Sequence, residues 1–219
     1  MTPPDGEARR YFGVYPAIVT DIVDPQGIGR IQVQFPWLGA NGSADVRAWA
    51  TLVSPYADDD QGLEILPSVD TQVVVAFEAG DLRRPYIIGA SWNGVESLPE
   101  AARSPNNLRL LKSRAGSKLE FDDTEGAAKV TVSMQSGHQV VLDDAAQQVT
   151  VTHQNGCTIT MDVAGRIAID ANVSVDVTAP IMNVHAATAN FDGIVTCSTL
   201  VADEGVVSPS YTPGEGNIW

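Results

Sequence analysis

Apolar and polar residues alternate in short runs along residues 14–92, with the two-residue period of β-strands that have one buried face. The run at residues 29–35 (GRIQVQF) is the clearest, because every second residue from Ile31 to Phe35 is apolar. The same pattern predicts further strands at residues 14–23, 46–53, 72–78 and 86–92. Turn formers, such as the DPQG segment at residues 24–27, separate the runs.

These five strands, with one long loop at residues 54–70, predict an antiparallel β domain. Short strands in this number fit a small, partly closed barrel of the oligonucleotide/oligosaccharide-binding (OB) type. A β-sandwich is the alternative that the strand pattern leaves open.

The second half of the chain is repetitive. The segment AGSKLEFDD (115–123) returns as SGHQVVLDD (136–144) and, more weakly, as NGCTITMD (155–162), so that the glycines are 21 and then 19 residues apart. A period near 20 residues predicts a β array in which no single repeat buries its apolar face. Second strands follow the three copies, and two more closely spaced runs come after them, at residues 129–132, 148–151, 166–169, 173–177 and 181–184.

One chain of two-strand repeats would leave long strand edges and an uncovered apolar face, which both favour aggregation. Three chains around one axis would bury the apolar faces centrally and would cover one another's edges. The pattern therefore predicts an intertwined homotrimer, a triangular β-helix or β-prism. The predicted fold class is all-β, with an OB-fold barrel followed by this trimeric β-helix.

Charge changes in the middle of the chain. Residues 1–129 hold 12 basic and 18 acidic residues, whereas residues 130–219 hold 9 acidic residues and one basic residue, Arg166. Such a shift indicates a domain boundary. The predicted parts are an N-terminal extension (1–10), an OB-fold domain (11–95), a linker (96–114), a trimeric β-helix (115–207) and a C-terminal tip segment (208–219).

The net charge of −14 argues against nucleic acid as a partner, because DNA and RNA binding requires a basic surface. Trp37, Trp49 and Trp92 are therefore expected to fill the barrel or a trimer interface rather than to stack on bases. Cys157 and Cys197 make no disulfide framework and are expected to be small buried side chains. With no signal-peptide pattern and no run of about 18 apolar residues, we expect a soluble product made in a cytoplasm.

Several motifs in order along the chain resemble one known family. They are YFGVY (11–15), GRIQVQFPW (29–37), EAGDLRRPYIIG (78–89), WNG (92–94) and the ending SPSYTPGEGNIW (208–219). These motifs resemble phage baseplate assembly protein V and its relatives, the central spikes of contractile tails, of extracellular contractile injection systems and of type VI secretion. The resemblance covers most of residues 11–95 and the C-terminal segment.

The resemblance implies a homotrimeric spike that lies on a baseplate hub beneath the tail tube and pierces the envelope of the target cell. Its location would be the baseplate of a virion or of an injection particle. Type VI spikes carry long hub-like domains before the barrel, whereas only residues 1–10 precede Tyr11, so we expect the hub to be a separate chain. The stretch between Val95 and Ala115 is too short for the muramidase domain that some phage spikes carry.

No catalytic or nucleotide-binding motif is present in the sequence, so we predict that the chain is not an enzyme and needs no cofactor. His138, His153 and His185 lie in separate repeats. His185 on a trimer axis could offer three imidazoles to one ion, but the His-x-His pair of phage spike tips is missing, which favours a polar or packed histidine.

Two acidic features also have structural interpretations. The loop from Asp58 to Glu64 lacks the bidentate glutamate of a calcium loop, so we expect a solvated loop. The pairs Asp122-Asp123 and Asp143-Asp144 recur with the repeat, which favours turn residues over the carboxylate pair of a glycosidase.

The C-terminal segment is glycine-rich and ends in an aromatic residue. We expect it to form a platform for a separate tip protein of the PAAR type, or a cap folded back on the last turn of the β-helix. The residues predicted to contact the tip protein are Tyr211, Pro213, Gly214, Asn217, Ile218 and Trp219. The alternatives are a trimeric adhesin-like fibre and a secreted β-helix enzyme that acts on polysaccharide.

Overall fold

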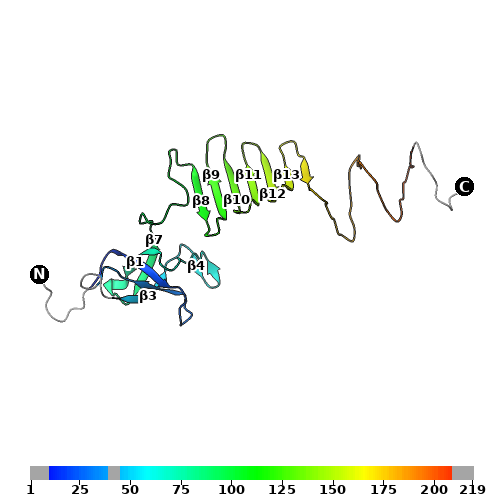
Figure 1. Ribbon diagram of the computed structural model, residues 1–219. Helices are drawn as coiled ribbons and strands as arrows, with labels where there is room; N and C mark the ends of the chain where they lie inside the picture. Colours follow the sequence, from blue (N-terminus) through cyan, green and yellow to red (C-terminus); the bar gives the residue numbers. More distant parts are fainter. Residues whose placement is uncertain (1–9, 39–44, 209–219) are drawn as a thin grey trace, which may run out of the picture.

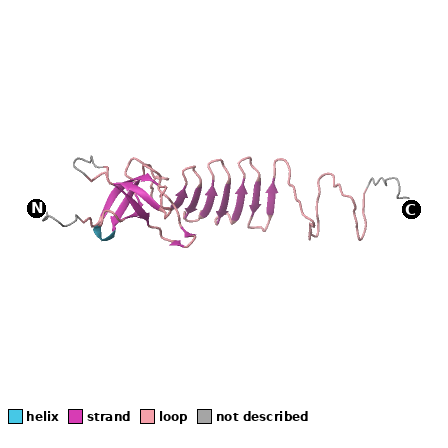
Figure 2. Cartoon of the chain, turned by 90° about the horizontal axis from the view of Figure 1, so that it is seen from below, coloured by secondary structure: helices cyan, strands magenta, loops and turns pink. Residues whose placement is uncertain are grey.

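A computed structural model describes residues 10–38 and 45–208 (Figure 1). Both views place a β-barrel at one end, a ladder of strands next to it, and residues 171–208 as an extended segment beyond the ladder (Figures 1 and 2). The predicted all-β class with an N-terminal barrel is confirmed, whereas a β-helix is not confirmed. No helix among the described residues is long and apolar enough to cross a lipid bilayer.

The barrel contains the five strands that the sequence predicts, and its closed order β1-β2-β3-β7-β6 excludes the sandwich alternative. Neighbouring strands pair antiparallel except β3 and β7, which pair in parallel through Thr51 and Tyr86. The long loop holds a small hairpin, and one 3₁₀ turn lies between β6 and β7. The elements are β1 (Val14–Asp21), β2 (Arg30–Gln34), β3 (Arg47–Leu52), β4 (Ala57–Asp58), β5 (Gln61–Gly62), β6 (Gln72–Phe77), η2 (Glu78–Gly80) and β7 (Pro85–Ala90).

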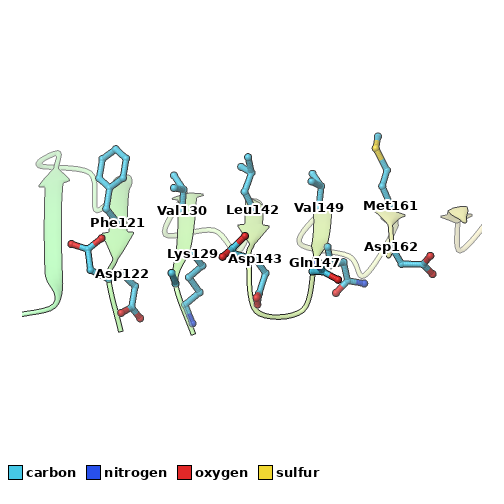
Figure 3. Close-up of a pocket in the computed structure, with 14 residues that line it drawn as sticks. Phe121, Asp122, Lys129, Val130, Leu142, Asp143, Gln147, Val149, Met161 and Asp162 are labelled. Atoms are coloured by element: carbon cyan, nitrogen blue, oxygen red, sulfur yellow. The ribbon is translucent and has the colours of Figure 1, made fainter. Parts of the chain in front are cut away.

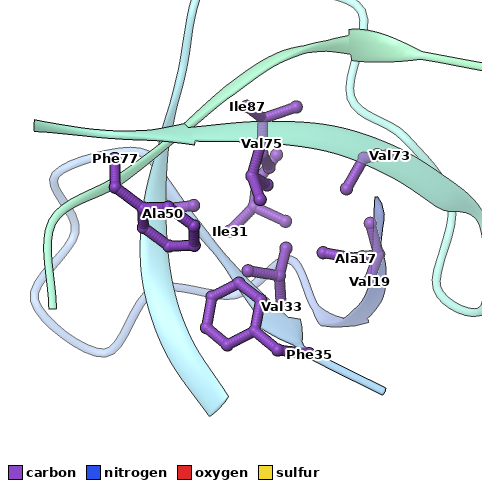
Figure 4. Close-up of a cluster of buried hydrophobic side chains, with 10 residues drawn as sticks. All are labelled: Ala17, Val19, Ile31, Val33, Phe35, Ala50, Val73, Val75, Phe77 and Ile87. Carbon is purple, nitrogen blue, oxygen red and sulfur yellow. The ribbon is translucent and has the colours of Figure 1, made fainter. Parts of the chain in front are cut away.

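The barrel has a closed apolar core, because the alternating residues of its strands point inward (Figure 4). Phe35 is completely buried and contacts the ring of Phe77, with the ring centroids 5.5 Å apart. The core residues are Ala17, Val19, Ile31, Val33, Phe35, Ala50, Val73, Val75, Phe77 and Ile87. Every buried residue of the described chain lies in the barrel domain, so the ladder has no core of its own.

The ladder is a seven-stranded antiparallel sheet in which each strand pairs with the strands before and after it in the sequence. The strands are β8 (Leu108–Lys112), β9 (Lys118–Asp122), β10 (Lys129–Ser133), β11 (Gln139–Asp143), β12 (Gln148–Thr152), β13 (Thr158–Met161) and β14 (Ile167–Asp170). The repeats therefore find their strand partners within one chain over this stretch, rather than in neighbouring chains as the intertwined prediction requires. Strand β8 also lies inside the predicted linker, because the run LRLLK has no β-branched residue and alternates poorly.

The recurring glycines of the repeat lie in the hairpin turns along one edge of the ladder. Gly116 and Gly137 have φ of +82° and +102°, which other residues rarely adopt. A Cβ on Gly116 would approach the Gln135 side chain of the next turn to 3.0 Å, and one on Gly137 would approach the Gln154 side chain to 3.7 Å. The period of about 20 residues thus reflects one hairpin stacked on the next.

Residues 171–208 form no strand, although the sequence predicts strands at residues 173–177 and 181–184. Their apolar side chains are exposed: Val173 is 96% exposed and Ile194 is 97% exposed. A strand requires a neighbouring backbone for its hydrogen bonds, and no other described segment of this chain pairs with this one. The apolar and polar residues do alternate there, but the described part of this chain provides no partner strand.

Candidate functional site

The ladder has one almost entirely apolar face. The strand pairing aligns its side chains in two rows, which we call the apolar face: Arg109, Phe121, Val130, Leu142, Val149, Met161 and Ile167 in one row, and Leu111, Leu119, Val132, Val140, Val151, Ile159 and Ile169 in the other. Ten of these side chains are 37–65% exposed, of which Leu119 is the least exposed and Ile167 the most. An apolar surface of this extent on one chain indicates an interaction surface.

The opposite face of the same sheet is polar. Its central row contains Glu120, Thr131, Thr150 and Thr160 together with Leu110, Val141 and Ala168, and mostly charged, amide and hydroxyl side chains flank it. One face of the sheet is therefore apolar and the other polar, as in sheets that have one covered face and one face in water. The ladder is built to be covered on one face only.

The two edges of the ladder also differ. We call the turns at residues 113–117, 134–138 and 153–157 the histidine edge, because they contain Arg114, His138 and His153 and no acidic residue. We call residues 122–129, 143–148 and 162–166 the acidic edge, because six of their residues are acidic and two are basic.

An open groove of about 610 Å³ lies where the apolar face meets the acidic edge. Figure 3 shows Phe121, Leu142 and Met161 aligned across the strands, with Asp122 and Asp143 at the strand ends beside them. The side-chain hydroxyl of Thr124 donates to the Asp122 carboxylate and, together with the Thr124 backbone N–H, lowers its pKa. The prediction that these aspartates are turn residues agrees with this placement, since Asp122 and Asp143 each accept a backbone N–H of the following turn.

His138 and His153 lie side by side on the histidine edge. They extend the β11–β12 ladder just beyond the pair Gln139 and Thr152, and their ring centroids are 4.4 Å apart with 57° between the planes. Local contacts hold both rings: His138 Nδ1 accepts the backbone N–H of Gln154 at 3.4 Å, and His153 Nδ1 lies 2.7 Å from Asn155 Oδ1. Sequence reasoning placed these histidines in separate repeats, and strand pairing brings them together.

His185 is not part of this pair, because it lies in the extended segment and is exposed. Cys157 is half-buried and Cys197 is exposed, and both are free, so the expectation of two buried thiols is wrong for Cys197. No three metal-binding side chains converge within residues 10–38 and 45–208. The residues predicted to contact a tip protein, Tyr211 to Trp219, lie outside the described residues.

One aromatic contact and one ion pair stabilise the surface of the barrel. Trp37 stacks on Tyr15 with centroids 4.6 Å apart and donates its indole N–H to the Pro16 carbonyl at 2.8 Å, so it packs on the barrel as expected. Asp24 accepts two hydrogen bonds from the Arg30 guanidinium, both at 2.9 Å. These contacts, with backbone N–H groups of the same turn, hold the pKa of Asp24 well below its usual range.

Two further placements concern exposed residues of the first half. Trp92 is 62% exposed and does not fill the barrel. The acidic loop from Asp58 to Glu64 forms the exposed β4–β5 hairpin, as expected for a solvated loop. The functional feature that sequence reasoning described least completely is the difference between the ladder edges, although the uneven distribution of Asp and His among the turns is visible in the sequence.

Known proteins share the barrel and part of the ladder. Residues 15–92 match the family described as the type VI secretion system/phage-baseplate injector OB domain. The chain is 24% identical over 155 residues to the type VI secretion system spike protein VgrG3 of Vibrio cholerae, a match that covers 65% of this chain and 15% of that protein. It is 27% identical over 117 residues to VgrG2a and 25% identical over 169 residues to VgrG4b, both spike proteins of Pseudomonas aeruginosa.

The matches to VgrG2a and VgrG4b cover 50% and 72% of this chain, but only 14% and 21% of those proteins. The chain thus spans a small part of the length of these relatives. The family match coincides with the closed barrel of β1, β2, β3, β6 and β7, and it also spans the small β4–β5 hairpin. Residues 15–92 therefore match the injector OB domain of type VI secretion systems and phage baseplates, and the chain is similar in sequence to spike proteins of type VI secretion systems.

Proposed function

We propose that the chain is a central spike of a contractile tail or injection system. Three copies associate with their apolar faces toward a common axis. The barrels lie on a separate hub protein beneath the tail tube, and the ladder points toward the envelope of the target cell. The far end carries a separate tip protein of the PAAR type. The role is mechanical, without catalysis, and the location is the baseplate, assembled in the bacterial cytoplasm.

The exposed apolar face carries this proposal. A fully buried leucine or valine gains about 1.5–3 kcal/mol, so burial of the remaining half of each side chain gains about 1 kcal/mol. Over the apolar face this amounts to about 10 kcal/mol per chain, or about 30 kcal/mol for three chains. Two association steps cost about 4–15 kcal/mol each. The two steps together cost about 8–30 kcal/mol, so the gain of about 30 kcal/mol equals or exceeds this cost.

The family match supports the orientation. The barrel is the part that matches the injector OB domain, and the ladder extends from it in one direction (Figure 1). An injector must join a baseplate at one end and meet its target at the other. The extended segment at residues 171–208 supports the pairing of chains beyond the ladder, because its alternating apolar residues require strands from other copies.

The mass of the full chain in solution tests the proposal. Three copies of the 23.2 kDa chain give a particle close to 70 kDa by light scattering. The particle should also resist detergent in an unboiled gel lane, because unfolding must separate three chains at once. A clean 23.2 kDa species would contradict the proposal, since the apolar face would then remain in water.

Binding assays test the two ends separately. The full chain, immobilised, should retain the hub protein of its own system and the PAAR-type tip protein. Trp219→Ala should weaken retention of the tip protein and leave retention of the hub unchanged. Equal loss of both partners would instead indicate that the variant is unfolded, and loss of neither would remove Trp219 from the proposed tip contact.

A further inference from the structure

The two edges of the ladder differ in charge, and a closed ring of copies must bring them together. In a three-fold ring with the apolar faces inward, each sheet forms one side of a triangle. Symmetry then makes every corner identical, so each corner joins the histidine edge of one copy to the acidic edge of the next. Two like edges never meet in such a ring.

The position of each turn along the length of the ladder determines which residues of neighbouring copies face each other. The connections alternate along the ladder: one turn of the histidine edge joins β10 to β11, and the next acidic turn joins β11 to β12. His138 and His153 belong to the ends of β11 and β12, and the acidic turn between these two strands is residues 143–148. Copies related by a three-fold axis have no axial shift, so this pair and this turn lie at the same level.

We propose that the His138–His153 pair of each copy receives the Asp144 carboxylate of the neighbouring copy, forming a polar seam at each corner of the trimer. This inference rests on the trimer of the proposed function. The partner is a second copy of this chain, and the contact fixes the register between copies.

The contacts within the chain favour Asp144 over Asp123, Asp143 and Asp162. Asp123 lies 4.0 Å from the Arg109 guanidinium, and Asp162 lies 3.4 Å from that of Arg166. The Asp143 carboxylate accepts the Ala146 backbone N–H at 2.8 Å. Within residues 10–38 and 45–208 the Asp144 carboxylate has no hydrogen bond or ion pair, and Asp144 is exposed.

The imidazole pair is suited to a carboxylate. The described contacts of both rings use Nδ1. In the tautomer in which Nδ1 accepts the backbone N–H of Gln154 or Asn155, Nε2 carries the proton and can donate it to an oxygen. A carboxylate that accepts hydrogen bonds from two imidazoles regains the hydrogen bonds to water that it loses on assembly. An apolar interface needs a polar contact of this kind to fix the register, because apolar contacts alone allow one copy to slip along the next.

Paired cysteines test the seam directly. In a background with Cys157→Ser and Cys197→Ser, the in-register variant carries His138→Cys and Asp144→Cys. The off-register control carries His138→Cys and Asp123→Cys, which moves the second thiol by two strands, or about 9–10 Å. The two ends of β11 are about 16 Å apart, so no disulfide forms within one chain.

After mild oxidation, the in-register variant should give a covalent trimer in a denaturing, non-reducing gel, and the control and both single-cysteine variants should not. Light scattering of the reduced variants at close to 70 kDa verifies that they assemble. A trimer of this mass without the in-register cross-link, or with the off-register one, overturns the seam and leaves the proposed function standing. A monomeric parent chain overturns both.

Discussion

A single lysine on the apolar face should dissociate the trimer. Leu142 is 48% exposed in the chain, so assembly buries about half of it, which is worth about 1 kcal/mol per copy. In Leu142→Lys this gain is lost, and an ammonium group without a partner enters an apolar interface at a cost of several kcal/mol. Symmetry repeats the penalty three times, so the total exceeds about 10 kcal/mol.

Val141→Lys is the matched control, because Val141 precedes Leu142 on the same strand and lies on the polar face. Its cross-strand neighbours are Thr131 and Thr150, so a lysine there reaches solvent. Light scattering over a dilution series should show Leu142→Lys at the mass of one chain at concentrations where Val141→Lys and the parent remain near three times that mass. Circular dichroism of the barrel-containing chain verifies that strand content persists.

Two outcomes would refute this reasoning. If both variants keep the mass of a trimer, the apolar face is not the interface. If Val141→Lys dissociates and Leu142→Lys does not, the polar face is inward, and the hydrophobic argument is reversed.

Three further predictions concern the barrel. Phe35→Ala should lower the free energy of unfolding of the barrel by about 3–5 kcal/mol in a urea titration, since it removes the largest fully buried side chain of the closed core. Gly80→Ala should cost at least about 1 kcal/mol, because Gly80 has φ of +77° and a Cβ there would approach Tyr11 N to 3.1 Å; a thermal melt measures it. Asp24→Asn should lower the urea midpoint at pH 6. Because Arg30 lowers the Asp24 pKa in the folded state, this stability is present above the unfolded pKa of about 3.9 and is lost on acidification, so the difference from the parent chain should shrink toward pH 2.

Local patterns account for most of the fold. The barrel strands were predictable because a closed barrel makes burial follow a strict two-residue period, as the run from Ile31 to Phe35 shows. The ladder strands were predictable for the same reason, and the repeat of Gly116 and Gly137 showed that the units stack. The pattern failed at β8, where leucines carry no strand preference.

Pairing between strands is what the sequence alone could not provide. The alternation near Val173 has the same period as that of β12, yet one finds a partner within the chain and the other does not. The contact of His138 with His153 likewise depends on the β11–β12 register, which sets residues 15 apart in the sequence side by side. Both features arise from non-local contacts, which a periodicity does not encode.

The orientation of the ladder determines how a load along a spike acts on the hydrogen bonds between its strands. The strands follow one another along the ladder away from the barrel, so the bonds between neighbouring strands run along its length (Figures 1 and 2). Tension along this direction would open one strand pair at a time, beginning at β14. Compression instead presses each strand onto the next, and failure then requires the sheet to buckle out of its plane. In the proposed trimer, three sheets joined at their corners would resist buckling, because each would hold the edges of the next. The ladder is thus suited to pushing rather than pulling, provided that the corners hold, and this makes the edge contacts as important to a spike as the apolar face.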